Sequence, residues 1–593
     1  MSAAATRLKP VDAVIVGVGW TGAIIARELT KAGLNVVGLE RGPPRSPQED
    51  FTLPGIRDEL RYAVRQELFQ DTATETVTLR HGGGETALPM RRWGAFTPGT
   101  GVGGAGSHWN GMHWRYLPYD LNPRSQIEAR YGRGAIPPEM TIGDFGIGWD
   151  EIEPYYDRFE KLCGVSGKAG NIKGQRIVGG NMLEGPRSSE FPNAPLVRTA
   201  SGDLFARTVE KLGYNSFPMP ASNASAAYTN FEGATLGACT YCGHCERFGC
   251  EVNAKASPNT TLMPGLLAEK RFTLRTGAYV QDIVYDRKAR RATGVRYVDT
   301  RTGDLFEQPA DLVILGGYVF TNTLLMLLSG IGKPYDPVTG KGAVGRNYCY
   351  QTGGGTQVFL KYAAFNPFMG AGALGTNIDE YNGDNLDHGG LGFFGGSTIG
   401  VTTGGGRPIV SRAVPPGTPR WGSAWKRATA DWYGRSFGIG ASGAQYAHRE
   451  NYLDLDPNYR DALGRPLLRM TFNYRENDYR LSEYAAGVTE RIARAMDATI
   501  VASPAPRRGN FHSVPYQSTH NTGGTIMGSD PRTSVVNRYL QSWDADNLFI
   551  LGASVFPQNT SYNPTGTVGA LAYWAADAIV NRYLKAPGPL VSA

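Results

Sequence analysis

The sequence predicts an α/β fold organised around a dinucleotide-binding unit near its start, and three local patterns lead to that prediction. Residues 11–16 are an apolar run rich in β-branched side chains, as in a buried parallel strand. The glycine turn GVGWTG at 17–22 follows directly, and an amphipathic stretch at 23–31 continues it. A second apolar run at 35–39 ends on Glu40. Strand, glycine turn, helix and strand in this order predict the first βαβ unit of a nucleotide-binding sheet.

The glycine and acidic positions of that unit suit an adenine dinucleotide. Gly17, Gly19 and Gly22 let the backbone approach a pyrophosphate, whose charge lies at the N-terminus of the following helix. Glu40 follows the motif by about 20 residues, where an acidic side chain accepts hydrogen bonds from ribose hydroxyls. The unit alone leaves NAD and FAD as alternatives.

Length, composition and charge limit the kinds of protein that this chain can be. The chain has 593 residues, which favours several structural units over one core, and its 78 glycines make it rich in turns. The formal charge of +7 is spread without a dense Lys/Arg run, so we expect no nucleic-acid partner. Residues 1–10 lack an apolar segment, and the most apolar window, 312–332, is interrupted by Gly and Asn. We therefore expect no signal peptide and no transmembrane span, with any membrane contact made through partner proteins.

Further segments complete the expected architecture. Residues 271–300 alternate apolar and polar side chains with turns between them, as in a β-meander. Residues 311–317 are expected to add a buried strand to the nucleotide-binding sheet, and 548–551 and 567–580 a strand and a helix. The glycine- and aromatic-rich region 350–515 suits an antiparallel sheet that forms the wall of a substrate cavity.

A second glycine-rich segment, TPGTGVGGAGSHWNGMHWRY at 97–116, interleaves glycines with Ser, His, Trp and Asn. Such a backbone can lie tightly against a flat group. We expect the loop to cover the flavin ring and pyrophosphate of a bound cofactor, with an ordinary glycine-rich connection as the alternative.

Four of the six cysteines lie in one short stretch, ACTYCGHCERFGCEV. Cys239, Cys242, Cys245 and Cys250 have the spacing C-x2-C-x2-C-x4-C, which is too dense for comfortable disulfides between neighbours. Thiolates packed this closely need a positive centre, and three in one tight turn favour an iron–sulfur cluster over tetrahedral zinc. We expect His244 to be exposed or to lie behind the ligands. Zinc, reactive thiols and disulfides are the alternatives, and the spacing fits a [3Fe–4S] or a [4Fe–4S] cluster.

The C-terminal region supplies the candidate catalytic pair. His520 lies in a glycine loop of a chain with only 8 histidines, and Asn563 lies in the loop SYNPTGT. A neutral imidazole can take the proton of an alcohol, whereas an amide cannot titrate and would orient the same hydroxyl. A capping or buried structural role for His520 is the alternative.

Together these motifs resemble the glucose–methanol–choline (GMC) family of FAD oxidoreductases. The similarity rests on GVGWTG…LERG, GVGG…WNGM, ATGV, SGIG, HNTGG and GAS…NPTGT, which occur in the family's order at both ends and in the middle of the chain. The resemblance implies FAD as the cofactor, His520 as the catalytic base and Asn563 as its partner. It implies that the cofactor contacts Gly17, Gly19, Gly22, Glu40, Arg41, Gly103, Gly104, His108, Asn110, Gly111, Val280, Ala553, Pro564 and Thr565.

The resemblance also implies an FAD-binding Rossmann-like domain with an interleaved antiparallel-sheet substrate domain. The expected segments are 1–116, 257–349 and 516–593 for FAD binding, the last also catalytic, 117–230 and 350–515 for the substrate domain, and 231–256 for the iron–sulfur loop.

Two segments of the sequence differ from most GMC members and resemble particular groups within the family. The segment GSHW at 106–109 looks like the loop of pyranose oxidase, in which the corresponding histidine is bonded to the flavin 8α-methyl group. We therefore expect His108 to bind FAD covalently, with non-covalent stacking as the alternative. The cysteine cluster resembles the flavoprotein subunits of bacterial membrane-bound sugar and sugar-acid dehydrogenases, which pass electrons through a [3Fe–4S] cluster. Among these, CTYCGHCERFGCEVNAKASPNTT and THNTGG look most like the gluconate 2-dehydrogenase group, and which cysteine is spare stays open.

That resemblance implies partners, a location and a reaction. The partners are a multihaem cytochrome c subunit and a small subunit with an export signal, at the periplasmic side of the bacterial inner membrane. The expected reaction oxidises a secondary alcohol of a sugar acid, D-gluconate to 2-keto-D-gluconate, with 2-keto-D-gluconate or a polyol such as sorbitol as alternative substrates. A flavin oxidase with structural zinc and a non-catalytic electron-transfer scaffold are competing functions, and the NPTGT segment disfavours an NAD dehydrogenase.

Overall fold

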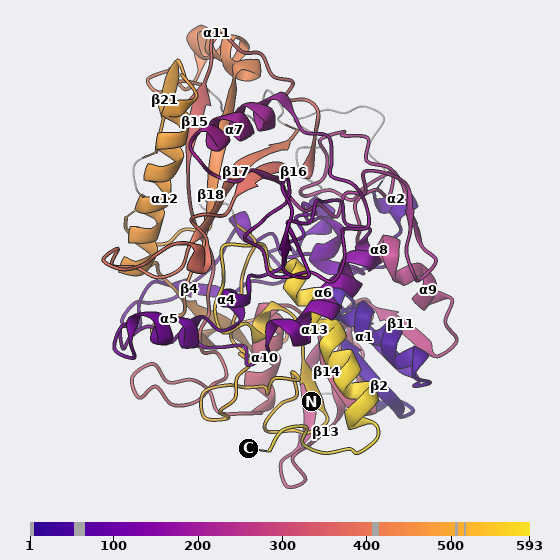
Figure 1. Ribbon diagram of the computed structural model, residues 1–593. Helices are drawn as coiled ribbons and strands as arrows, with labels where there is room; N and C mark the ends of the chain where they lie inside the picture. Colours follow the sequence, from indigo (N-terminus) through magenta and orange to yellow (C-terminus); the bar gives the residue numbers. More distant parts are fainter. Residues whose placement is uncertain (1–4, 52–65, 406–413, 505–507, 515–517, 593) are drawn as a thin grey trace.

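Two large sheets organise the chain (Figure 1). A mixed sheet lies in the lower part of the view, where the N-terminus is found. An antiparallel sheet lies at the upper left with α7 (Ala200–Lys211), α11 (Gly422–Trp432) and α12 (Glu476–Ala495). This arrangement confirms the predicted α/β class with an interleaved antiparallel sheet. The computed structural model describes residues 5–51, 66–405, 414–504, 508–514 and 518–592.

The mixed sheet contains the nucleotide-binding unit. Its strands are β1 (Thr6–Arg7), β2 (Val11–Val16), β3 (Val36–Glu40), β11 (Phe272–Thr276), β12 (Ala278–Asp286), β13 (Arg291–Asp299), β14 (Leu305–Leu315) and β22 (Leu548–Ile550). The order is β11-β3-β2-β14-β13-β12, and β1 and β22 also pair with β14. Strands β11, β3, β2, β14 and β22 pair in parallel, whereas β12 and β13 are antiparallel. Ala13, Val14 and Ile15 are fully buried, as expected for a parallel strand at the centre of a sheet.

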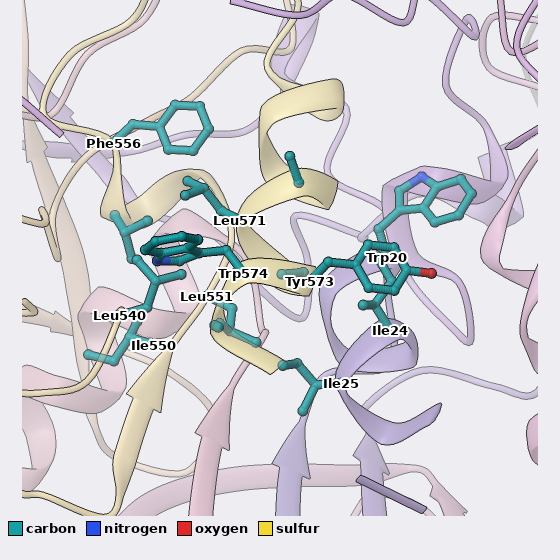
Figure 2. Packing of buried hydrophobic residues seen from close by; sticks show 14 of the residues in the cluster. Trp20, Ile24, Ile25, Leu540, Ile550, Leu551, Phe556, Leu571, Tyr573 and Trp574 are labelled. Atoms are coloured by element: carbon teal, nitrogen blue, oxygen red, sulfur yellow. The ribbon is translucent and has the colours of Figure 1, made fainter. Parts of the chain in front are cut away.

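Helices from three distant parts of the chain pack together beside this sheet. They are α1 (Trp20–Lys31), α6 (Trp149–Cys163) and α13 (Thr565–Ala578). Figure 2 shows Tyr573 of α13 extending toward α1, within one buried apolar cluster. Because α13 belongs to the C-terminal region, this packing brings both ends of the chain to the same part of the molecule.

The antiparallel sheet has its own core. Its strands, in spatial order, are β21 (Ile500–Ala502), β15 (Thr352–Phe359), β18 (Ser436–Gly443), β17 (Ser397–Gly404), β16 (Gly370–Ile378) and β8 (Phe217–Pro218). Apolar side chains of α7 and α12, such as Phe205 and Val488, form one buried cluster with Val358 and Ile399 of the sheet.

Smaller elements connect these units. The remaining strands are β19 (Tyr452–Arg460), β20 (Pro466–Thr471), β4 (Thr78–Arg80) and β5 (Leu88–Pro89) in one sheet, and the pairs β6 (Asn171–Ile172) with β7 (Gln175–Arg176) and β9 (Tyr228–Thr229) with β10 (Thr235–Leu236). Further helices are α2 (Pro47–Asp50), α4 (Pro118–Leu121), α5 (Pro123–Tyr131), α8 (Pro258–Thr261), α9 (Met263–Leu267) and α10 (Val319–Ser329). None of the described helices combines the length and apolar content that a membrane crossing needs.

A buried ion network fixes the end of the second glycine-rich segment, at Arg115. Arg115 donates from Nε to Glu160 Oε1 and from Nη1 to Glu153 Oε1, both at 2.7 Å, and Arg187 donates from Nη2 to Glu160 Oε2 at 2.5 Å. Burial alone would raise the pKa of Glu160, but the two guanidinium groups lower that pKa to about 2. Glu160 lies on α6, so the network ties this segment to the helix that packs on α13.

Most local predictions are confirmed, and one is partly wrong. The predicted strand at 11–16 is β2, and the strands expected at 311–317 and 548–551 lie in β14 and β22. The meander expected at 271–300 is partly wrong. Strands β12 and β13 form an antiparallel pair, but β11 returns to the nucleotide-binding sheet and pairs in parallel with β3. The proposed segment boundary at 516 lies outside the described residues.

Candidate active site

A cavity opens at the carboxyl ends of β2, β3 and β14, where ligands bind in open α/β sheets. Its wall comes from the first glycine turn, the second glycine-rich loop, the cysteine segment, β12 and the C-terminal region. The predicted site residues on this wall are Gly17, Gly19, Glu40, Arg41, Gly103, Gly104, His108, Asn110, Val280, His520, Ala553, Asn563, Pro564 and Thr565. The fold therefore gathers candidate residues from both ends and the middle of the chain around one cavity.

Two glycines predicted to contact the cofactor do not line the cavity. A Cβ atom at Gly22 would lie 2.0 Å from Gly17 O, so Gly22 permits the close packing of α1 against the turn. Gly111 has a φ of +94°, and a Cβ atom there would lie 2.6 Å from Asn223 Oδ1. Both glycines shape the loops around the cavity, and their contact with the cofactor stays a prediction.

The first glycine turn places an anchored carboxylate at the cavity. Glu40 Oε2 accepts from Val18 N at 3.1 Å, and Glu40 Oε1 accepts from Gly42 N at 2.9 Å. Burial raises the pKa of Glu40, while these backbone hydrogen bonds oppose that rise. Gly17 has a φ of +88°, and a Cβ atom there would lie 2.8 Å from Gly316 O, so the turn requires glycine.

The second glycine-rich loop is bonded to the first. Gly103 N donates to Val18 O at 2.8 Å, and a Cβ atom at Gly103 would lie 2.1 Å from Asn259 Oδ1. Two glycine segments thus meet at one wall of the cavity, with little side-chain bulk between a ligand and the backbone. This cradle fits the pyrophosphate and flavin of FAD.

His108 presents an unpaired nitrogen in this wall. Its side chain is buried, and its Nε2 has no hydrogen-bond partner among the described residues. Burial, with a further contribution from Lys255, lowers the pKa of His108 to about 3, so the imidazole is neutral. The ring of Phe69 lies 4.5 Å away, centroid to centroid. A buried nitrogen without a protein partner fits a wall that a cofactor covers.

His520 and Asn563 lie side by side, and a third residue fixes the imidazole. Asn563 Nδ2 lies 2.8 Å from His520 Nε2, and His520 Nδ1 lies 2.5 Å from Gln351 Oε1. Gln351 donates from Nε2 to Thr560 O at 3.1 Å and to Ser561 O at 2.8 Å, so its oxygen must face the imidazole. The hydrogen bonds therefore assign the His520 proton to Nδ1 and leave the lone pair of Nε2 toward Asn563.

The environment keeps His520 neutral. Burial lowers the pKa of His520 to about 4. Asn559 holds the loop by donating from Nδ2 to His520 O at 2.8 Å. A neutral imidazole with a fixed tautomer and a lone pair at the cavity has the properties of a general base.

Sequence reasoning missed several residues around this pair, including Gln351, Asn559 and Tyr318. Tyr318 lines the cavity with a φ of +82° and a ψ of 165°, a region that glycine dominates. Its hydroxyl accepts from Asn521 Nδ2 at 2.7 Å. The glycine pair that precedes Tyr318 signals a tight turn, but no local motif marks the two amides.

The cavity wall predicted from the antiparallel sheet is not observed among the described residues. The lining residues come from outside 350–515. The reason is that one face of this sheet packs on α7 and α12, and its side chains fill that core. The sheet reaches the site through Gln351, which directly precedes β15 and contacts His520.

The four predicted cysteine ligands line one small pocket together with His244. All four are free thiols, and burial raises the pKa of Cys239 to about 12 and raises the pKa of Cys245. Across the part of the chain that the structure describes, no three His, Cys, Asp or Glu side chains stand ready to hold a metal ion. The pocket offers the donor atoms of a thiolate site, and the side chains would have to draw together as they exchange protons for metal.

The cysteine segment lies directly against the second glycine-rich loop. Arg247 N donates to His108 O at 2.7 Å, and Glu246 and Arg247 line the cavity beside His108. The residue before Glu246 is Cys245, which lines the cysteine pocket. One short stretch of backbone therefore separates the two pockets.

Comparison with known proteins identifies the class. Residues 140–352 and 447–572 match the two sequence profiles described as GMC oxidoreductase. The chain belongs to the GMC oxidoreductase family. It is an FAD-dependent oxidoreductase that acts on CH–OH donors, which confirms the predicted family, the flavin cofactor and the enzyme class.

Individual relatives cover nearly the whole chain. The gluconate 2-dehydrogenase flavoprotein of Pantoea cypripedii is 50% identical over 99% of this chain and 96% of its own length. The fructose dehydrogenase large subunit of Gluconobacter japonicus is 26% identical over 96% of this chain and 98% of its own length. The solved structure of pyridoxine 4-oxidase from Mesorbium loti has a similar fold, with a TM-score of 0.57 and 16% identity over 96% of this chain and 99% of that chain.

The hydrogen bonds predict the protonation state of His520. In spectra of ¹⁵N-histidine-labelled protein, His520 should carry its proton on Nδ1 and stay neutral until the pH falls to about 4. The signal is assigned by its loss in His520→Gln. Gln351→Leu removes the Nδ1 acceptor and should give mixed tautomers, whereas Gln351→Glu should keep the tautomer and raise the pKa. A His520 that titrates near the ordinary pKa of about 6.5 would contradict this geometry.

Proposed function

We propose that this chain is the flavoprotein subunit of a dehydrogenase that oxidises a secondary alcohol of a sugar acid, D-gluconate to 2-keto-D-gluconate. The similarity to a gluconate 2-dehydrogenase flavoprotein over nearly the full length supports this substrate class. The observation on which the electron route rests is that the four-cysteine segment also lines the cavity, through Glu246 and Arg247.

His520 and Asn563 would handle the substrate hydroxyl. The Nε2 lone pair of His520 and the Nδ2 group of Asn563 face each other. A substrate alcohol would replace this mutual hydrogen bond: its hydroxyl would give its proton to Nε2, and its oxygen would accept a hydrogen bond from Nδ2. Oxidation to the ketone removes that proton from the hydroxyl oxygen and a hydride from the carbon that bears it, and FAD, when bound, would supply the hydride acceptor. Asn563 cannot titrate, so it positions the oxygen while His520 holds the proton.

The cavity residues would hold separate parts of FAD. Glu40, fixed by Val18 and Gly42, would accept hydrogen bonds from the ribose hydroxyls. Thr565 begins the 14-residue helix α13, whose N-terminus favours an anionic group. The other proposed FAD contacts are Gly17, Gly19, Arg41, Gly103, Gly104, Asn110, Val280, Ala553 and Pro564.

We further propose that His108 bonds FAD covalently. Its buried Nε2 has no partner among the described residues, and its low pKa keeps the imidazole neutral, so in the tautomer with the proton on Nδ1 this nitrogen carries a lone pair. This lone pair would form the bond to the 8α carbon in place of one C–H bond of the methyl group, whose proton would leave and whose two electrons would reduce the flavin ring itself.

Denaturation tests the covalent bond. The unfolded holoenzyme should keep its flavin fluorescence with the protein band, and the peptide that contains His108 should carry the mass of FAD. His108→Ala should release FAD on denaturation. The matched control is His113→Ala, which changes a second buried histidine of the same loop and should retain bound FAD. Complete release of FAD from the wild-type protein would contradict the proposal.

The cysteine segment would connect this site to partner proteins. Cys239, Cys242, Cys245 and Cys250 supply enough thiolates for a [3Fe–4S] cluster with one spare cysteine, and such a cluster, when bound, carries electrons singly. The electrons would pass to a multihaem cytochrome c subunit. A small subunit with an export signal would bring the assembly to the periplasmic side of the inner membrane. One relative is named as a large subunit, which supports a multi-subunit assembly.

Flavin bleaching tests the reaction. Anaerobic D-gluconate should bleach the wild-type flavin, and His520→Ala should slow bleaching by about 10²–10⁴-fold with FAD retained, because a general base contributes that much. The wild-type rate should stay level at neutral pH and fall as the pH drops through about 4, where His520 becomes protonated. His512→Ala, at an exposed histidine, is the control. An unchanged rate in His520→Ala would overturn its role, and faster bleaching by 2-keto-D-gluconate or sorbitol would overturn the substrate.

Metal analysis tests the cysteine site. The purified protein should contain iron and acid-labile sulfide in place of zinc. Replacing Cys239, Cys242, Cys245 and Cys250 singly by Ser should lower the iron content for at least three of the four. Cys163→Ser, at a cysteine buried in α6, should leave the iron content unchanged. Zinc without sulfide would contradict the assignment.

A further inference from the structure

A buried lysine lies between the two loops that the proposed function connects. Lys255 is 1% exposed, and its Nζ donates to Trp109 O at 2.5 Å, Cys245 O at 2.7 Å and Phe248 O at 2.7 Å. Trp109 belongs to the second glycine-rich loop, and Cys245 and Phe248 belong to the cysteine segment. Three donors on three carbonyl oxygens use the full hydrogen-bonding capacity of an ammonium group.

Lys255 is part of a continuous contact between the loops. Trp109 Nε1 donates to Ala256 O at 2.8 Å, and Arg247 N donates to His108 O at 2.7 Å. The glycine-rich loop is therefore bonded to the residue after Lys255 and to the cysteine segment before it. The ammonium group of Lys255 adds a third link, because it bonds to carbonyl groups of both loops.

The charge of Lys255 needs a counter-charge. Burying an ammonium group is costly unless an anion compensates it, and the three acceptors of Lys255 are uncharged carbonyl groups. Burial lowers the pKa of Lys255, and negative charge on Cys242, Cys245, Cys250 or Glu246 opposes that fall, whereas the neighbouring His108 is neutral. Cysteines that bind metal do so as thiolates, so a loaded cysteine site places negative charge beside this lysine.

We propose that Lys255 is a positioning residue for electron transfer, which holds the cysteine loop on the flavin loop and raises the reduction potential of the cluster by its fixed positive charge. The inference rests on the proposed function in one respect, namely that the cysteines hold an iron–sulfur cluster. Reduction adds one electron to the cluster, and a buried cation nearby stabilises the more negative state.

The test is the cluster potential, measured by a redox titration followed by electron paramagnetic resonance. Lys255→Met should keep its iron but shift the one-electron equilibrium about tenfold toward the oxidised cluster, a fall of about 59 mV. Lys255→Arg retains the charge and should keep the wild-type potential. The matched control is Lys168→Met, at a partly exposed lysine that pairs with Glu190, and it should also leave the potential unchanged.

The outcomes separate this inference from the function on which it rests. A wild-type protein without iron and sulfide would overturn the cluster itself. A loaded wild-type protein whose potential is unchanged in Lys255→Met would overturn only the role of Lys255. If the reduction potential falls as far in Lys255→Arg as in Lys255→Met, the effect comes from the changed geometry. The claim that the positive charge raises the potential would then be overturned. If Lys255→Met loses its native circular dichroism, Lys255→Gln replaces it in the test. Its amide can still donate to the carbonyl groups, and its reduction potential should fall by the same amount.

Discussion

The contact between the cysteine segment and the second glycine-rich loop is the constraint on which the rest of the site depends. Arg247 N bonds to His108 O, and Lys255 bonds to Trp109 O across 146 residues of sequence. Buried backbone groups need partners, and here each loop satisfies those of the other. The same contacts therefore hold the wall of the large cavity and the wall of the cysteine pocket.

The proposed catalytic pair, His520 and Asn563, depends on a second long-range contact. Gln351 precedes the first long strand of the antiparallel sheet, and its amide orientation is set by two backbone oxygens of the C-terminal region. Through this one amide, a sheet that does not line the cavity decides which nitrogen of His520 carries the proton. The interleaving of the two sheets in the chain thus bears on the proposed chemistry, because a residue next to the antiparallel sheet orients the proposed base.

Short-range patterns predicted the first βαβ unit because its strands, turn and helix are local in sequence. The resemblance to a family, and not periodicity, predicted that His520 and Asn563 would meet, and the structure places them 2.8 Å apart. Gln351 could not be predicted, because its role depends on an amide orientation fixed more than 200 residues away. The close packing around Gly22 and Gly111 could not be predicted either, because a glycine motif does not distinguish a glycine facing a ligand from one packed on protein atoms.

The central claim is that the flavin site and the cysteine site act as one relay. Anaerobic stopped-flow spectroscopy of the isolated chain with D-gluconate tests it most directly, with absorbance followed in the flavin band and in the broader iron–sulfur band. We predict that the flavin bleaches first and then partly recovers while the cluster bleaches, with no partner protein present. A flavin that stays bleached beside a cluster of unchanged absorbance would contradict the relay.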